Sequence, residues 1–246
     1  MNFSGNTILI TGGASGIGFA FAERFLAAGN EVIVCGRREE KLREAQEKHP
    51  RLHARVCDVA EEAERIALFE WTTSEFPNLN VLVNNAGIQR RVKLTESEDW
   101  QKTRREIAIN LDAPIHLSRL FVPHLAAREN PSILNVTSGL SFVPLANVPV
   151  YCATKAALHS FTLSLRFQLQ ETPIEVIEII PPAVDTDLGG VGLHTFGANL
   201  DEFADAVFER LKQGEKEIAY GTAEKSSRAT REELDGIFKF MNQNSG

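Results

Sequence analysis

The sequence predicts an α/β fold in which helices cover both faces of one parallel sheet of about seven strands. Short runs rich in Val, Ile and Leu alternate with longer segments of helical periodicity along the chain. The runs are continuously apolar, as expected for strands that helices bury on both sides. A glycine-rich turn, TGGASGIG, follows the first run and opens the first helical segment. Together these features predict a doubly wound sheet, the Rossmann fold.

The expected elements follow one another in a regular order. The expected strands are NTILIT, EVIVCG, LHARVC, LNVLVN, SILNVTS, IEVIEII and a short last strand, EIAYG. The expected helices cover residues 16–29, 39–48, 61–76, 95–127, 150–172, 201–213 and, as a polar helix, 228–242. Pro77 and Asn78 mark the turn before the fourth strand, and Pro173 ends the helix before the sixth.

The length and composition predict one domain. The chain has 246 residues, of which 43% are hydrophobic and 24% charged, and no flexible linker or internal repeat divides it. We therefore treat 1–246 as one dinucleotide-binding and catalytic domain. The stretch 187–197 is rich in glycine and predicts a mobile loop. We accordingly expect a substrate lid over 186–213 and a C-terminal tail over 222–246.

Charge, cysteines and hydropathy narrow the class of protein. No signal-peptide pattern opens the sequence and no long uncharged span follows, so we expect a cytoplasmic protein that does not enter a membrane. Cys35, Cys57 and Cys152 are scattered, which predicts reduced thiols and no metal site. The net charge of -7 argues against nucleic acid as a partner.

The glycine turn predicts a phosphate site because it lies between a strand and a helix. Gly12 would permit the tight turn, Gly16 the close approach of a pyrophosphate, and Gly18 the packing of helix on strand. Ser15 and Ile17 belong to the same expected site. The alternative is a turn that serves packing alone, but its position favours binding of a dinucleotide.

The end of the second strand favours NADP(H) over NAD(H). Many NAD enzymes carry an acid there for the ribose hydroxyls, whereas this chain has Gly36 followed by Arg37 and Arg38. Arginine can bind a 2′-phosphate through paired hydrogen bonds. Arg38 could equally be a surface residue of the next helix, so Arg37 is the stronger candidate.

Two further strand ends should complete the cofactor cleft. Asp58 and Val59 follow the third strand and would lie near the adenine. Asn85, Ala86 and Gly87 close the fourth strand; alone they could simply form a turn, but beside the glycine turn they predict the neighbouring wall of the cleft.

Tyr151 and Lys155 stand one helical turn apart in YCATK, so they should share a helix face. A phenol with a pKa near 10 is a poor base at neutral pH, and a neighbouring ammonium can stabilise the phenolate. Ser138 ends the fifth strand and Asn110 lies in the helix before it. Each residue also has a structural alternative. Ser138 could cap a turn and Tyr151 could be a core aromatic. Lys155 could be an exposed helix residue, and Asn110 could bond the backbone of its own helix.

These motifs together resemble the short-chain dehydrogenase/reductase family. The match covers TGGASGIG, NNAG, INLDAP, Ser138, YCATK and IIPPAVDTD, in order and spacing, over nearly the whole chain. PPAVDTDL and RATREELDGIFKFMN are similar to the DltE-type oxidoreductases within that family. The resemblance implies an NADP(H)-dependent carbonyl reductase or alcohol dehydrogenase.

The resemblance also implies a role for each residue. Tyr151 would exchange a proton with the substrate oxygen, Lys155 would lower the tyrosine pKa and hold the nicotinamide ribose, and Ser138 would hydrogen-bond the substrate oxygen. Asn110 would steady a water that relays protons. Near the nicotinamide carboxamide the expected contacts are Pro181, Val184 and Thr186. Pro182 replaces the usual glycine, which stiffens this loop.

The substrate should lie among the segments that follow the strands. These segments are residues 88–91, 140–149 and 186–199, and the apolar stretch SGLSFVPLANVPVY would suit a small hydrophobic ketone, aldehyde or secondary alcohol. Arg90 or Arg91 could bind an acidic substrate group or form a solvated rim. The long helices 95–127 and 150–172 have wide apolar faces, which favour a homo-oligomer, either a dimer or a tetramer. Two alternatives are a dinucleotide-binding regulatory or scaffold protein and an epimerase or dehydratase.

Overall fold

The computed structural model describes residues 2–243 and contains a seven-stranded sheet in the order β3-β2-β1-β4-β5-β6-β7. Every adjacent pair of strands runs parallel. The strands are β1 (Thr7–Thr11), β2 (Glu31–Gly36), β3 (His53–Val56), β4 (Leu79–Asn84), β5 (Ser132–Val136), β6 (Glu175–Ile180) and β7 (Glu217–Ala219). The strand order reverses between β1 and β4, where the carboxyl ends of parallel strands commonly open a ligand crevice.

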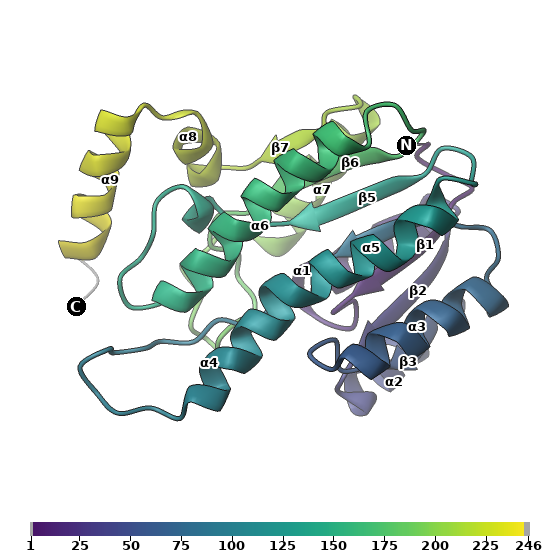
Figure 1. Ribbon diagram of the computed structural model, residues 1–246, viewed down its shortest axis with the longest axis horizontal. Helices are drawn as coiled ribbons and strands as arrows, with labels where there is room; N and C mark the ends of the chain where they lie inside the picture. Colours follow the sequence, from purple (N-terminus) through teal and green to yellow (C-terminus); the bar gives the residue numbers. More distant parts are fainter. Residues whose placement is uncertain (1, 244–246) are drawn as a thin grey trace.

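Helices cover both faces of the sheet, as predicted. They are α1 (Gly16–Ala27), α2 (Glu39–Lys48), α3 (Glu62–Glu75), α4 (Trp100–Ile107), α5 (Ala113–Leu125), α6 (Pro149–Gln168), α7 (Leu200–Lys212), α8 (Thr222–Arg228) and α9 (Arg231–Gln243). In Figure 1, α3, α5 and α6 cross in front of the sheet. Within the described residues, no helix is both long and apolar enough to span a membrane.

Two apolar cores hold the layers together. Phe21 and Phe25 of α1 pack with Phe203 of α7 against one face of the sheet. Phe121 of α5 and Leu68 of α3 belong to the core on the other face. The side chains of Phe21, Phe25, Phe121 and Leu68 are all fully buried. Strands β1, β2, β4, β5 and β6 each contribute side chains to both cores, as expected for strands that helices cover on both faces.

The helix expected over residues 95–127 is the largest departure from the prediction. It begins only at Trp100, and a π-helical turn (Ala108–Asp112) separates α4 from α5. Side-chain periodicity does not reveal such a turn, because the extra residue shifts the apolar face without ending the helix. The side chain of Asn110 within this turn bonds the backbone of Ile88, which fixes the irregularity in place.

The C-terminal region also differs from the single helix expected over 228–242. It forms α8 and α9, with Ala229 in an extended conformation between them. A capping box starts α9: the Glu233 carboxylate accepts hydrogen bonds from the backbone amide of Thr230 at 2.7 Å and from its hydroxyl at 2.9 Å. The helix bearing Tyr151 is likewise shorter than expected, ending at Gln168 rather than residue 172.

Candidate active site

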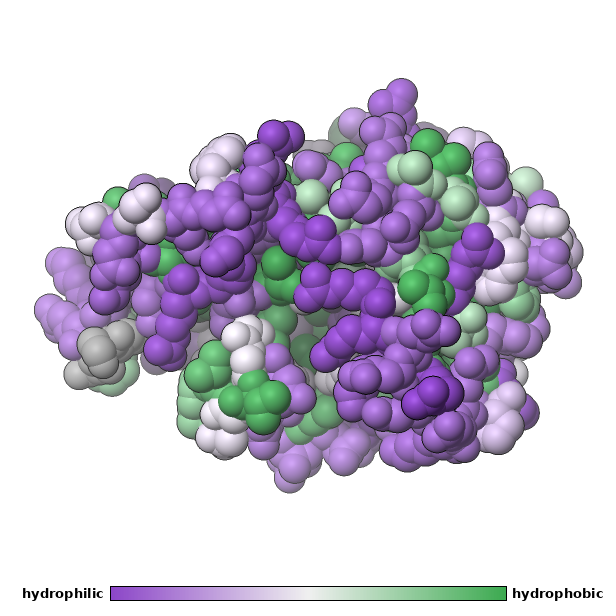
Figure 2. Space-filling view, turned by 90° about the horizontal axis from the view of Figure 1, so that it is seen from below, coloured by the Kyte–Doolittle hydropathy of each residue, from purple (hydrophilic) through white to green (hydrophobic). Residues whose placement is uncertain are grey.

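A cavity of about 1490 Å³ opens at the carboxyl edge of the sheet. Seen from below, hydrophobic side chains gather around a hollow in a mostly hydrophilic face (Figure 2). The cavity is lined by the following predicted cofactor residues: Gly12, Ser15, Gly16, Ile17, Arg37, Arg38, Asp58, Val59, Asn85, Ala86, Gly87, Tyr151, Lys155, Pro181, Val184 and Thr186. Ser138 lines it too, whereas Gly18 and Asn110 lie behind the wall.

The glycine turn has the backbone shape of a phosphate cradle. Gly12 and Gly16 have φ angles of 65° and 53°, a region that residues with a Cβ rarely adopt. A Cβ on Gly12 would also lie 2.9 Å from the Cα of Ala86. Gly16 begins α1, whose first amides have no partner within the helix. These residues fit the pyrophosphate of a dinucleotide.

Gly18 supports the turn from behind. A Cβ at this position would lie 2.4 Å from Nδ2 of Asn85 and 2.5 Å from the carbonyl oxygen of Gly12. Any larger residue would therefore separate α1 from the adjoining strand ends. This is the packing position that the sequence predicts for the third glycine.

Thr11 joins the glycine turn to NNAG, a connection that the sequence prediction missed. Its hydroxyl accepts hydrogen bonds from the amides of Asn85 at 3.0 Å and Ala86 at 3.1 Å. The Asn85 side chain donates back to the carbonyl oxygen of Thr11 at 2.9 Å. The two halves of the cleft are thus fixed to each other at the point where the strand order reverses.

The two arginines after β2 are exposed and border the cavity. Nη2 of Arg38 donates a hydrogen bond to the Ser15 hydroxyl at 2.9 Å, which holds this guanidinium beside the glycine turn. Arg38 is also the residue that precedes α2. Both positions are compatible with a 2′-phosphate, and the contact with Ser15 gives Arg38 a defined place that its sequence position did not indicate.

Asp58 lies at the same end of the cavity and links it to α4. Its carboxylate forms an ion pair with Arg105, and it also accepts a hydrogen bond from the amide of Ala60 at 3.1 Å. The carboxylate is therefore held in one orientation at the edge of the cleft.

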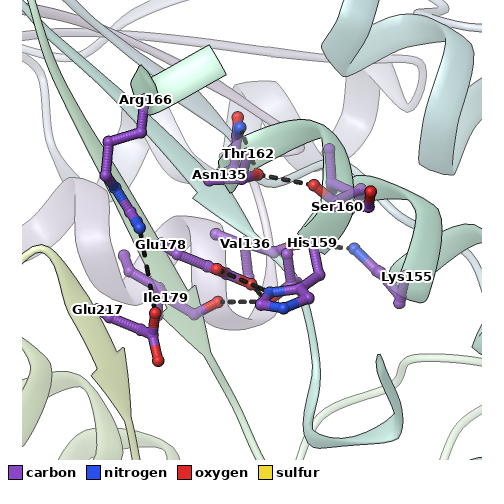
Figure 3. Close-up of polar contacts among 12 residues, drawn as sticks. Asn135, Val136, Lys155, His159, Ser160, Thr162, Arg166, Glu178, Ile179 and Glu217 are labelled. Atoms are coloured by element: carbon purple, nitrogen blue, oxygen red, sulfur yellow. Dashed lines mark hydrogen bonds and ion pairs between the residues drawn. The ribbon is translucent and has the colours of Figure 1, made fainter. Parts of the chain in front are cut away.

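Ser138, Tyr151 and Lys155 converge on the other half of the cavity. Ser138 follows β5 and accepts a hydrogen bond from the amide of Leu140 at 3.1 Å, starting a short 3-10 turn (Gly139–Ser141). Tyr151 and Lys155 lie on the first turns of α6 and are only 6% and 4% exposed. Nζ of Lys155 donates to the carbonyl oxygen of Val136 at 2.7 Å (Figure 3).

Burial governs the protonation of these groups. It raises the pKa of Tyr151 above its ordinary value of 10, and the hydrogen bond with Ser138 offsets only part of this effect. Burial also lowers the pKa of Lys155 to about 8. Nζ of Lys155 lies 5.8 Å from the centre of the Tyr151 ring. In this arrangement desolvation of the phenolate therefore prevails, and the pKa of Tyr151 is raised rather than lowered.

Asn110 uses its whole amide to hold the segment after NNAG. Its Oδ1 accepts from the amide of Ile88 at 2.9 Å, while its Nδ2 donates to the Ile88 carbonyl at 2.8 Å and to the Thr154 hydroxyl at 3.2 Å. The alternative that it bonds its own helix is wrong. Since Thr154 precedes Lys155, the amide connects the segment after β4 with α6.

Sequence reasoning missed Glu106, a fully buried carboxylic acid on α4. Burial raises its pKa to about 7, and the amide and charge of Arg90 oppose this shift. The carboxylate in turn raises the pKa values of both Tyr151 and Cys152. A single glutamate in a charged helical stretch gives no sequence signal that it will be buried.

A second buried carboxylate, Glu178 of β6, contacts Thr137, the residue that precedes Ser138. It accepts hydrogen bonds from the Thr137 hydroxyl at 2.7 Å and from Nδ1 of His159 at 2.9 Å. Figure 3 shows His159 beside Lys155, with its ring facing Glu178. This pairing raises the pKa of His159. The network joins α6 to β6 and to the residue that precedes Ser138.

The predicted substrate segments 88–91, 140–149 and 186–199 all contribute to the cavity wall. Arg90 forms an ion pair with Glu98, and Arg91 is exposed. A wall that was not predicted comes from α9, through Gly236, Ile237, Phe240 and Met241. The apolar residues of RATREELDGIFKFMN recur at helical spacing, which was the available signal.

Known proteins agree with this architecture. A family model described as short chain dehydrogenase matches residues 6–191. The uncharacterized oxidoreductase DltE of Bacillus subtilis (strain 168) is 49% identical over 98% of each chain. The chain belongs to the short chain dehydrogenase family. The expected similarity to the DltE-type oxidoreductases is confirmed with it.

Two further proteins are similar to this chain. The NADP-dependent 3-hydroxy acid dehydrogenase YdfG of Escherichia coli (strain K12) is 32% identical over 72% of each chain. A short chain dehydrogenase from Burkholderia cenocepacia J2315, solved in complex with NADP, superposes with a TM-score of 0.84 at 26% identity, covering 97% of this chain and 99% of that one. The protein is therefore an oxidoreductase of this family.

Proposed function

We propose that this protein is an NADP(H)-dependent oxidoreductase that interconverts a carbonyl compound and its secondary alcohol, with Tyr151 as the proton donor and acceptor. The observation that carries the proposal is the convergence of Ser138, Tyr151 and Lys155 on a cavity whose other half holds the glycine turn. The bound dinucleotide supplies or accepts the hydride. The chain has only to orient the two reactants and move one proton.

The hydroxyls of Ser138 and Tyr151 form the proton-transfer site. Both would hydrogen-bond the substrate oxygen, and Tyr151 would give it a proton in reduction or take one in oxidation. The neutral phenol, favoured by burial, is the form needed for reduction. The phenolate needed for oxidation requires a cation, and Lys155 is the cation one helical turn away.

Lys155 has N–H donors that its contact with Val136 does not use. An ammonium has three N–H donors, and its contact with Val136 uses one of them. The others can hold the nicotinamide ribose, while the charge stabilises the phenolate. Asn110 keeps the helix and the end of β4 in register around this site.

Arg37 and Arg38 support NADP(H) as the preferred nucleotide, and so do the NADP-dependent relative and the NADP complex. Both guanidiniums stand at the cavity edge where a 2′-phosphate would lie, and Arg38 already contacts the phosphate turn through Ser15. We extend the proposal to Pro181, Val184 and Thr186 as contacts of the carboxamide, since all three line the cavity.

The remaining expectations become proposals with narrower bounds. The lid cannot include α7, whose Phe203 and Val207 are fully buried against the sheet, so we propose a lid over 186–199.

Leu163 and Phe167 lie one turn apart on α6 and are 43% and 70% exposed, which supports a dimer through this helix. The three cysteines are free thiols, in keeping with a reducing compartment such as the cytoplasm.

The test is a panel of hydrophobic ketones, aldehydes and secondary alcohols, followed by the absorbance of NADPH, with NADH measured in parallel. We expect turnover of at least one ketone–alcohol pair, with a higher kcat/KM for NADPH than for NADH. Equal or better efficiency with NADH would overturn the cofactor assignment. Tight binding of NADPH without turnover of any substrate would favour the regulatory or scaffold alternative.

A further inference from the structure

Helix α9 lies apart from the layers of the fold. In Figure 1 it stands at the end of the molecule, beyond α8 and away from the sheet. None of its described residues is buried, and Phe238 and Phe240 are 40% and 71% exposed. A helix with so little buried surface contributes little to the core, so its apolar residues need another explanation.

Asn242 fastens this helix to the substrate side of the active site. Its Oδ1 accepts a hydrogen bond from the amide of Ala146 at 2.6 Å, and its Nδ2 donates to the carbonyl oxygen of Pro144 at 3.1 Å. Both partners belong to the segment between Ser138 and Tyr151. The end of α9 is therefore tied to the loop that joins two catalytic residues.

One face of α9 borders the cavity that contains Tyr151. Ile237, Phe240 and Met241 line it, and Gly236 leaves open space where a side chain would stand. The other walls of this part of the cavity are also apolar, formed by Leu140, Leu145, Val148, Leu188, Leu193 and Phe196. Apolar side chains from α9 and from these loops therefore line the same cavity as Tyr151.

We propose that α9 is a wall of the substrate compartment that favours carbonyl compounds with a long apolar substituent, chiefly through Phe240 and Met241. This inference rests on the proposed function. The carbonyl lies at Ser138 and Tyr151, and the chain extends along α9. Phe240 faces the cavity and is still 71% exposed, so a substrate chain can cover apolar surface there. Each methylene that is buried strengthens binding about fourfold.

The experiment compares 2-butanone, 2-hexanone, 2-octanone and 2-decanone as substrates with NADPH. The proteins are the natural chain, Phe240→Ala and Phe238→Ala. Phe238 lies on the same helix but outside the cavity lining, so it is the matched control. NADPH binding, measured by fluorescence, verifies that all three are folded.

The natural protein should gain in kcat/KM with chain length, by about fourfold for each methylene that reaches α9. Phe240→Ala should lower the ratio of 2-decanone to 2-butanone efficiency about tenfold and change 2-butanone less than twofold. Phe238→Ala should leave the ratio within twofold. The inference is overturned if Phe240→Ala keeps the natural ratio, or if Phe238→Ala lowers it equally.

Calorimetric binding of the same ketones to the NADP⁺-saturated protein separates this inference from the proposed function. If no ketone or alcohol is turned over but the Kd improves with chain length in the natural protein and not in Phe240→Ala, the hydride transfer is refuted and the role of α9 stands. If turnover is found and neither Kd nor kcat/KM responds to chain length, the proposed function stands and the inference fails.

Discussion

The ammonium of Lys155 donates a hydrogen bond to the carbonyl oxygen of Val136, 2.7 Å away at the end of β5. This contact fixes the cation of the catalytic helix to the strand that leads to Ser138. Burial lowers the pKa of this lysine to about 8, well below its ordinary value, because it disfavours the charged form. A charged Lys155 at neutral pH therefore costs the folded state stability.

Lys155→Met should consequently stabilise the protein while abolishing its activity. A lysine pKa that is lower in the folded state costs stability below about pH 8, and this cost disappears as the pH rises toward the unfolded value. We expect the variant to gain about 2 kcal/mol in urea unfolding at pH 7 and little at pH 10, with kcat/KM reduced at least about 100-fold. A loss of stability at pH 7 would contradict the assignment.

Glu106→Gln should show the opposite dependence on pH. A carboxyl pKa raised to about 7 by burial contributes favourably at low pH, and that contribution falls as the pH rises from the unfolded value of 4.5 through 7. The glutamine variant should be about 2 kcal/mol more stable than the natural protein at pH 8 and nearly equal to it at pH 5. Urea unfolding at both pH values measures this. A gain that is the same at pH 5 and pH 8 would contradict the assignment.

His159→Gln should weaken the fold most in mild acid. Pairing with Glu178 raises the histidine pKa, so its contribution is fully present below the unfolded pKa and is lost as the pH rises through the folded one. Loss of a buried charged hydrogen bond costs about 1.5 kcal/mol. We expect that cost at pH 6 and a smaller one at pH 9, measured by thermal unfolding. A cost independent of pH would mean that the pair is not ionic.

The two arginines after β2 should separate NADPH from NADH. Arg37→Ala and Arg38→Ala each remove a guanidinium from the cavity edge. Loss of a charged contact with phosphate costs about 1.5 to 3 kcal/mol, or about 10- to 100-fold in kcat/KM for NADPH, with little change for NADH. The larger loss identifies the residue that binds the phosphate. If neither variant loses efficiency with NADPH, NADP(H) specificity has another source.

The sheet and the cofactor turn could be predicted because both follow from local sequence. Continuous apolar runs identify buried parallel strands, and glycines between a strand and a helix identify a phosphate turn. All seven expected strands are present, and helices cover both faces. The motifs also place Ser138, Tyr151 and Lys155 at one predicted site, and the structure brings all three to one cavity.

The features that could not be predicted depend on tertiary contacts. The π-helical turn exists because Asn110 reaches Ile88, 22 residues away. Glu106 is buried by the packing of α4 against its neighbours, and the hydrogen bond from Lys155 to Val136 joins residues that are 19 apart in the chain. The placement of α9 over the cavity depends on Asn242 and a segment about 100 residues earlier in the chain.

The most direct test of the account is the turnover of Tyr151→Phe with NADPH and a ketone that the natural protein reduces. The variant keeps the ring and removes only the hydroxyl, and NADPH fluorescence verifies that it still binds nucleotide. We predict a fall in kcat of at least about 100-fold, the ordinary contribution of a positioned acid. Turnover within threefold of the natural protein would contradict the role of Tyr151 and the mechanism built on it.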